Sequence, residues 1–212
     1  MPDTLETIAA DVRVCPKCRL SQTRTQAVPG EGSPNAEILF IGEGPGFHED
    51  QQGRPFVGAA GQLLVEMLRE IGVRREEVFI TNVVRCRPPG NRDPLPDELA
   101  ACDAYTQRQI AVLNPGLIVT LGRYSMARFI GQGSMRDLHG RTREWNGITC
   151  LAMYHPAAIL RTPTLEMRRM YEGDFRKIPP LVAEARKKRA VAMAQAAALQ
   201  AAAARLDQLP LF

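Results

Sequence analysis

The run AEILFIG at residues 36–42 leads directly into EGPG at residues 43–46, and this junction decides the fold. The first part is a short apolar segment, which is typical of a buried strand. The second part is a turn made of small residues and proline. Residues 59–72, AAGQLLVEMLREIG, then place apolar side chains at helical spacing and end at a glycine. A buried strand, a turn and an amphipathic helix form the first unit of an alternating α/β fold.

The same alternation continues along the chain. Further strands are predicted at 77–85 (EVFITNVVR), 116–122 (GLIVTLG) and 147–154 (GITCLAMY). Helices are predicted at 3–11, 95–114, 123–131 and from 164 to about 204. Strands that alternate with helices pair in parallel and are covered on both faces. We therefore expect an α/β protein, a three-layer α/β/α sandwich with a four-stranded parallel sheet.

The overall composition fits one such domain with an appendage. The chain has 212 residues, of which 45% are apolar and 24% charged, and its formal net charge is +4. These values exclude a wholly disordered chain, and the mild basicity is compatible with an acidic polymer as partner. No apolar run approaches the roughly 20 residues of a membrane span, and the N-terminus has no apolar signal core. We expect a cytoplasmic protein with no membrane partner.

Four of the five cysteines form two pairs, Cys15-x2-Cys18 and Cys86-x15-Cys102. In a reducing compartment structural disulfides are rare, so this set suggests a tetrathiolate site for zinc or for a [4Fe–4S] cluster. Zinc ribbons usually have two short knuckles, and the long second pair favours iron–sulfur. The alternative is four unrelated buried thiols. Cys150 stands alone in an apolar strand and is predicted to be a core residue.

Unusual residues accompany three of the predicted strands. Glu43 and the aromatic Phe56 follow the first strand, Asn82 lies within the second, and His155 follows the fourth. Because ligands bind at the carboxyl ends of strands in such sheets, we expect these residues to share one pocket. Each has a plainer explanation, such as an asparagine satisfied by nearby backbone or a histidine that caps a helix. Their occurrence together, with the four cysteines, favours a functional site.

The motifs GEGPG, GRPFVG, TNVVRCRPPGNRDP and HPAAILR, with the four cysteines, closely resemble the family 4 uracil-DNA glycosylases. The resemblance covers about residues 3–182 in order. It implies the uracil-DNA glycosylase fold, a base-excision activity on uracil-containing DNA and a [4Fe–4S] cluster. Gly44 stands where the family usually has Ala, and we expect little effect. A related branch that becomes covalently linked to uracil-DNA has a basic, histidine-containing insertion after the asparagine motif. This chain lacks it, so we expect ordinary turnover.

The resemblance also assigns roles to the pocket residues. Phe56 would stack on a flipped uracil, and Asn82 would donate to uracil O4 and accept from N3–H, which rejects cytosine. His155 would donate a hydrogen bond to O2 as the uracil anion forms, and Glu43 would position or activate water, unless it is structural. The catalytic set is therefore Glu43, Asn82 and His155. The uracil-binding set is Gly42, Glu43, Gly44, Gly46, Phe56, Asn82 and His155.

Contacts to the DNA strand are expected from two segments. After the histidine, Ile159 or Leu160 would wedge into the gap left by the flipped base, and Arg161 would meet a phosphate. The alternative for Ile159 and Leu160 is a place in the core. The arginines that surround the third cysteine would track the DNA backbone, and these are Arg85, Arg87 and Arg92.

The C-terminal part differs in composition from the catalytic domain, which we place at residues 1–182. Residues 183–206 are basic and rich in alanine, which predicts a helical extension. Residues 207–212, DQLPLF, resemble the short peptide by which bacterial repair and replication proteins bind the sliding clamp, through Gln208, Leu209, Leu211 and Phe212. The alternatives are a chance match or a tail folded back on the body. We expect a monomer.

Two rival functions fit part of the pattern. One is a non-catalytic iron–sulfur protein that binds or senses uracil in DNA. The other is a zinc-stabilised nucleotide-binding domain.

Overall fold

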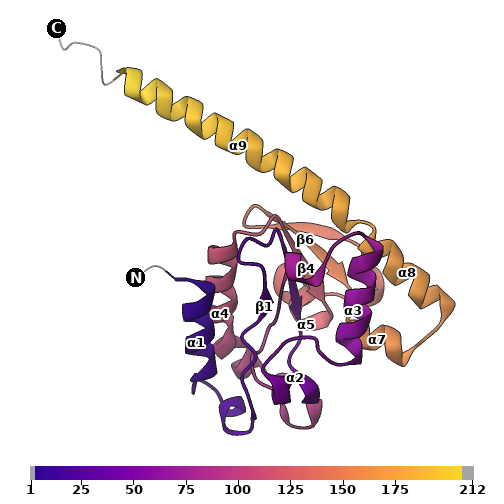
Figure 1. The fold of residues 1–212 in the computed structure, drawn as a ribbon. Coiled ribbons are helices and arrows are strands. Elements are labelled where there is room, and N and C mark those ends of the chain that lie inside the picture. Colours follow the sequence, from indigo (N-terminus) through magenta and orange to yellow (C-terminus); the bar gives the residue numbers. More distant parts are fainter. Residues whose placement is uncertain (1–2, 207–212) are drawn as a thin grey trace.

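A computed structural model describes residues 3–206 (Figure 1). Its mixed sheet has the strand order β1-β3-β2-β4-β6-β5. The strands are β1 (Glu31–Gly32), β2 (Ile38–Gly42), β3 (Phe79–Asn82), β4 (Leu117–Leu121), β5 (Thr142–Trp145) and β6 (Ile148–Met153). The inner strands β3, β2, β4 and β6 are parallel, which confirms the predicted four-stranded parallel sheet. The sheet is larger than expected, because β1 and β5 add antiparallel strands at its two edges.

The edge strands were missed because neither contains an apolar run. β1 has only two residues, and three of the four residues of β5 are exposed. A signal for β5 does exist in the sequence. Asn146 and Gly147 form the turn between β5 and β6, and both have positive φ angles, of 48° and 78°. Asn-Gly between two strands is typical of a tight hairpin turn, so this dipeptide could have revealed the strand.

Helices cover both faces of the sheet. They are α1 (Leu5–Arg13), α2 (Phe47–Gln52), α3 (Ala59–Glu70), α4 (Pro96–Leu113), α5 (Arg123–Phe129), α6 (Met135–Leu138), α7 (Pro156–Arg161), α8 (Leu165–Phe175) and α9 (Ile178–Leu206). In β2, Phe40 belongs to a core with α3, α8 and α9, whereas its neighbour Leu39 belongs to a core with α4 and α5. Successive side chains of a strand point to opposite faces. The two cores therefore lie on opposite sides of the sheet, which confirms the three-layer sandwich.

A third, smaller core holds the N-terminal helix in place. Ile8 and Val12 of α1 are fully buried and pack with Cys102 and Tyr105 of α4 and with Cys86. This cluster attaches the start of the chain to the side of the sandwich, next to the loop that follows β3.

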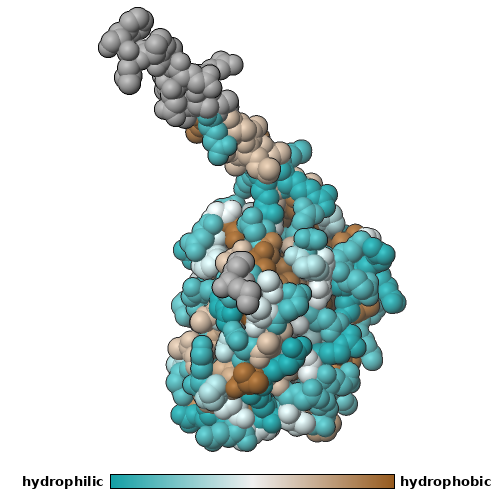
Figure 2. All heavy atoms as spheres, turned by 60° about the vertical axis from the view of Figure 1, so that its left-hand side comes forward, coloured by the Kyte–Doolittle hydropathy of each residue, from teal (hydrophilic) through white to brown (hydrophobic). Residues whose placement is uncertain are grey.

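The helix α9 extends from the sandwich and projects away from it (Figures 1 and 2). Residues 164–204 were predicted as one helical stretch, but the chain forms two helices, α8 and α9. The proposed boundary at 182/183 lies inside α9, where Val182 and Ala185 are still buried. Arg186 donates to Glu37 at 2.9 Å and Lys188 to Glu144 at 3.0 Å, so part of the basic extension is paired with the body.

The expected clamp-binding peptide at residues 207–212 lies outside the described residues. Within residues 3–206, α9 included, no helix has the length and apolarity that a membrane crossing requires.

Candidate active site at the carboxyl ends of the strands

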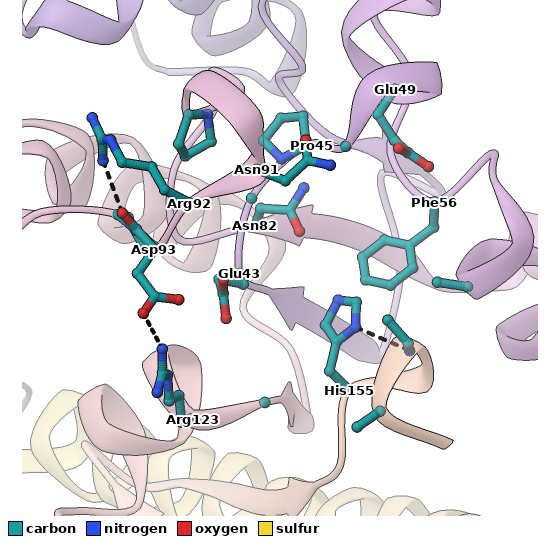
Figure 3. Close-up of a pocket in the computed structure, with 18 of the residues that line it drawn as sticks. Glu43, Pro45, Glu49, Phe56, Asn82, Asn91, Arg92, Asp93, Arg123 and His155 are labelled. Atoms are coloured by element: carbon teal, nitrogen blue, oxygen red, sulfur yellow. Dashed lines mark hydrogen bonds and ion pairs between the residues drawn. The ribbon is translucent and has the colours of Figure 1, made fainter. Parts of the chain in front are cut away.

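A cavity of about 650 Å³ opens where β2, β3 and β6 end (Figure 3). Most of the predicted pocket residues line it together, namely Glu43, Gly44, Gly46, Phe56, Asn82, Arg92, His155 and Arg161. The expected convergence of three strand ends is therefore present in the structure. Residues that the sequence did not single out also line the cavity, and these include Glu49, Asn91, Asp93, Arg123 and Tyr154.

Asn82 is the last residue of β3 and lies beside Gly42, the last residue of β2. The Asn82 side chain is 1% exposed, and its Oδ1 has no hydrogen-bond partner within the described residues. Gly42 makes room for it, since a Cβ there would collide with Oδ1 and lie 2.7 Å from the ring of Phe56. A buried, unpaired amide oxygen is costly unless a ligand supplies a donor. This oxygen is thus the strongest sign of a binding function in the pocket.

Phe56 forms one wall of the cavity, and its ring centre lies 5.5 Å from that of His155. Its backbone has a φ of +52°, which is uncommon for a residue other than glycine. Two charged side chains fix this loop: Glu49 Oε1 accepts the N–H groups of Val57 and Gly58, each at 2.9 Å, and Arg75 Nη1 donates to the Phe56 carbonyl at 3.1 Å. Glu49 and Arg75 carried no recognisable signal in the sequence.

His155 caps the N-terminus of α7 and also reaches the cavity. Its Nδ1 accepts the N–H of Ala157 at 3.2 Å. Burial lowers the pKa of His155 to about 4, assisted by the charge of Arg161. The imidazole is therefore neutral at physiological pH, and its proton resides on Nε2, because Nδ1 acts as an acceptor. The sequence had suggested helix capping as an alternative role for His155. In the structure the same side chain caps α7 through Nδ1 and keeps an N–H donor for the pocket.

Glu43 follows β2 directly, and Asp93 and Arg123 lie near it (Figure 3). Burial raises the pKa of Glu43, and the negative charge of Asp93 raises it further, whereas Arg123 and Arg161 act in the opposite direction. Asp93 forms an ion pair with Arg123. The cavity thus contains a carboxyl group with an elevated pKa next to an ion pair, an arrangement that is common at sites of proton transfer.

Two of the expected DNA contacts are wrong. Arg85 is 1% exposed, and its Nη2 donates to Thr106 Oγ1 at 3.0 Å and to Gln109 Oε1 at 2.8 Å. It therefore supports the loop after β3 from inside and cannot reach a phosphate. Ile159 is buried in the core on the α7 side, whereas Leu160 is 45% exposed. Of the two residues, only Leu160 is accessible from outside.

Arg92 lines the cavity, and Arg87 lies in the same loop. Arg87 Nε donates to Asn91 Oδ1 at 2.7 Å. Arg92 donates to both oxygens of the buried Glu98, at 2.9 and 2.6 Å. This second contact anchors the rim to α4.

The four paired cysteines line one small cavity between α1, α4 and the loop after β3. Arg24 Nη1 donates to Cys86 Sγ at 3.1 Å, and the Lys17 N–H to Cys15 Sγ at 3.5 Å. Burial raises the pKa of Cys86 to about 11 and also raises that of Cys102. Sulfurs that gather in one place and receive N–H donors suit a metal–thiolate group, which keeps its ligands deprotonated.

The cysteines share one site. Within residues 3–206, no group of three His, Cys, Asp or Glu side chains is arranged to hold a metal ion. The four paired cysteines nevertheless line the same small cavity. Cys150 lies apart from them, fully buried in β6, which confirms its place in the core.

Taken together, the sandwich and its pocket define an α/β protein with a cavity at the carboxyl ends of parallel strands, lined by an aromatic ring and an unpaired amide oxygen. Comparison with known protein families identifies the family to which this chain belongs. The model of the uracil DNA glycosylase superfamily matches residues 29–177, and the chain belongs to that superfamily.

Several curated proteins are similar over most of the chain. A type-4 uracil-DNA glycosylase of Sulfurisphaera tokodaii is 50% identical over 189 residues, covering 84% of this chain and 85% of that protein. One of Archaeoglobus fulgidus is 46% identical over 84% of this chain and 94% of its own length. One of Thermotoga maritima is 43% identical over 82% of this chain and 93% of its own length. These similarities confirm the resemblance drawn from the motifs.

Proposed function

We propose that this protein is a uracil-DNA glycosylase that hydrolyses the N-glycosidic bond of a flipped deoxyuridine and leaves an abasic site, in base-excision repair. The superfamily and the names of the similar proteins support the reaction class. The observation that carries the proposal is the buried, unpaired Oδ1 of Asn82 in the pocket. The protein would act in the cytoplasm on uracil-containing DNA, and one chain supplies every residue of the pocket.

Recognition of the base would depend on Asn82 and Phe56. The free Oδ1 accepts a hydrogen bond from uracil N3–H, and the amide nitrogen donates to O4. Cytosine has an acceptor at N3 and a donor at position 4, so it would leave both groups of the amide unsatisfied. Phe56 offers a face on which the extruded ring stacks. Gly44 and Gly46 line the cavity as backbone, where they could contact the base edge and exclude the methyl group of thymine.

Cleavage would depend on His155 and Glu43. The bond breaks with its electron pair moving to the uracil, which becomes an anion, while the sugar becomes cationic. The Nε2–H of the neutral His155 donates to uracil O2 as that negative charge develops. The carboxylate of Glu43 accepts a proton from the attacking water and stabilises the sugar cation. The water oxygen then forms the new bond to the sugar.

The DNA around the uracil would be held by α7. Leu160 is exposed and precedes Arg161, which lines the cavity, and it would enter the gap in the base stack. Arg161, which lines the cavity, would contact a phosphate. Arg87 and Arg92 would contact the strand from the other side of the pocket.

We also propose that Cys15, Cys18, Cys86 and Cys102 bind a [4Fe–4S] cluster. Their placement between α1, α4 and the loop after β3 supports a structural role for that group. When bound, it would supply a fixed cross-link between these segments, and the residues of the pocket carry out the chemistry. A zinc ion is the alternative, and an absorbance band near 400 nm would distinguish the two.

The function is tested by incubating the protein with oligonucleotides that contain uracil, thymine, cytosine or hypoxanthine at one position, and measuring abasic sites. We expect excision of uracil, and a loss of at least about tenfold in the single-turnover rate for Asn82→Ala, since a buried recognition group is removed. The absorbance of the cluster serves as the control for folding. Binding of uracil-DNA without abasic sites would instead identify the non-catalytic alternative. Equal rates for wild type and Asn82→Ala would disprove the pocket assignment.

We propose further that residues 207–212 bind a bacterial sliding clamp. The support is the sequence match of Gln208, Leu209, Leu211 and Phe212 at the end of a chain whose last described helix projects from the body. Deletion of residues 207–212 should abolish binding to the clamp and leave excision on short oligonucleotides unchanged. Clamp binding that persists after the deletion would contradict this assignment.

A further inference from the structure

An exposed aromatic side chain lies at the rim of the pocket and has no role in the reaction described above. Phe47 is the first residue of α2 and is 52% exposed. Gly46, directly before it, and Glu49, two residues after it, line the cavity. A single exposed hydrophobic residue is ordinary on a protein surface. Phe47 differs from such a residue because it adjoins residues of the pocket and contacts an arginine.

Phe47 is paired with an arginine from a second loop. The guanidinium carbon of Arg87 lies 5.2 Å from the centre of the Phe47 ring. Arg87 precedes Pro88 and Asn91, which line the same cavity. The pair therefore bridges the loop after β2 and the loop after β3 on one side of the pocket.

The charge of this arginine is available for a ligand. Arg87 donates through Nε to the neutral side chain of Asn91, and it forms no ion pair with a carboxylate anywhere in residues 3–206. Its terminal nitrogens thus have no anionic partner in the described part of the chain. An aromatic face beside a cation is a combination that binds nucleobases and their phosphates.

Helix α7 has a similar combination of residues. Leu160 is exposed and is followed by Arg161, which lines the cavity. Two segments near the cavity thus present a large hydrophobic side chain together with an arginine. The flat ring of Phe47 suits a base face, whereas the branched Leu160 suits a gap in the stack.

We propose that Phe47 and Arg87 form a stacking subsite for the base next to uracil in single-stranded DNA. This inference rests on the proposed function and deepens it, since it concerns the form of DNA that the site prefers. The pocket takes one ring, so the neighbouring base remains at the rim. In a duplex that base stays paired and stacked and has no free face. In a single strand its face can lie on Phe47 while Arg87 contacts the adjoining phosphate.

The test compares the dissociation constants of Phe47→Ala and wild type for one uracil-containing oligonucleotide as a single strand and as a duplex. A 2′-fluorine on the deoxyuridine sugar slows cleavage, so that fluorescence anisotropy reports binding. We expect Phe47→Ala to weaken single-strand binding by about fivefold or more and duplex binding by less than about twofold. Phe47→Trp should restore single-strand binding, and Met193→Ala, an exposed hydrophobic residue on α9, should change neither value.

Two results overturn the subsite. One is a ratio between the single-strand and duplex losses below about twofold, and the other is a failure of Phe47→Trp to restore binding. A disturbed pocket is recognised separately, because it lowers kcat at saturating substrate whereas loss of the subsite raises KM. Excision by the wild-type protein is measured in parallel. Absence of excision would refute the proposed function, while the binding comparison would still decide the role of Phe47.

Discussion

The base pocket and the cysteine site are close in sequence but opposite in character. Asn82, the last residue of β3, belongs to the pocket, and Cys86, four residues further along the chain, belongs to the cysteine site. In the pocket, the buried Oδ1 of Asn82 has no partner within the described residues. In the cysteine site, Cys86 already accepts a hydrogen bond from Arg24 and packs in a small apolar core. The pocket thus offers an unpaired group to a ligand, whereas Cys86 in the cysteine site already has a hydrogen-bond partner.

Arg85 stands between the two regions and shows how one supports the other. Its buried guanidinium donates to the Asn82 carbonyl and to Thr106 and Gln109. The backbone of the recognition residue is thus held from the side of α4, the helix that also carries Cys102. We call the cysteine site with Arg85 the rigid region and the base pocket the reactive region. The rigid region determines where the reactive region presents its unpaired groups.

The largest expected effect comes from breaking the rigid region. If the four cysteines hold the proposed cluster, Cys102→Ala removes one of its ligands, and structural metal sites contribute about 10 kcal/mol of folding free energy in small domains. We therefore expect loss of the absorbance near 400 nm and a decrease of several kcal/mol in the free energy of unfolding. Chemical denaturation of Cys102→Ala and of the wild type measures the difference in the free energy of unfolding.

The matched control is Cys150→Ala, a buried cysteine outside the site. It should keep the absorbance and lose only the small contribution of one buried sulfur. If Cys102→Ala retained both its colour and its stability, the four thiols would be unrelated core residues.

A smaller effect, confined to the rate, is expected in the reactive region. His155→Ala removes the N–H donor to uracil O2, which is worth on the order of 3 kcal/mol or about a hundredfold in the single-turnover rate. The absorbance near 400 nm should remain, because the histidine does not contact the cysteine site. His155→Gln keeps an N–H donor and should recover part of the rate. A rate within about twofold of wild type for His155→Ala would exclude this role.

The sequence predicted the inner strands and the pocket because both depend on local patterns. Apolar runs mark buried strands, and the residues that follow them meet at one sheet edge whatever the rest of the chain does. Arg85 and Ile159 were assigned to DNA because neither charge nor hydrophobicity shows which way a loop or a short helix turns. Burial of an arginine depends on partners such as Thr106 and Gln109, more than twenty residues away, and no local pattern reveals them.

The charged groups around Glu43 were missed for the same reason. Asp93 lies in the loop before α4 and Arg123 is the first residue of α5, so they meet only in the fold. Their ion pair lies beside a carboxyl group whose chemistry the sequence had already suggested. The sequence therefore revealed the chemistry of the reactive group but not the neighbours that adjust it.

The smallest expected effect is a shift in pH dependence that comes from these neighbours. Burial and then Asp93 raise the pKa of Glu43 above its usual 4.5, while Arg123 lowers it. The excision rate should therefore increase with pH through this raised pKa and level off above it, because the ionised carboxylate is the active form. Asp93→Asn removes the negative neighbour and should move this acid limb to lower pH, whereas Arg123→Gln should move it to higher pH. His155, with a pKa of about 4, stays neutral through most of this range. Single-turnover rates between about pH 5 and pH 8 measure the limb, and shifts in the same direction for both variants would show that Glu43 is not the group that titrates.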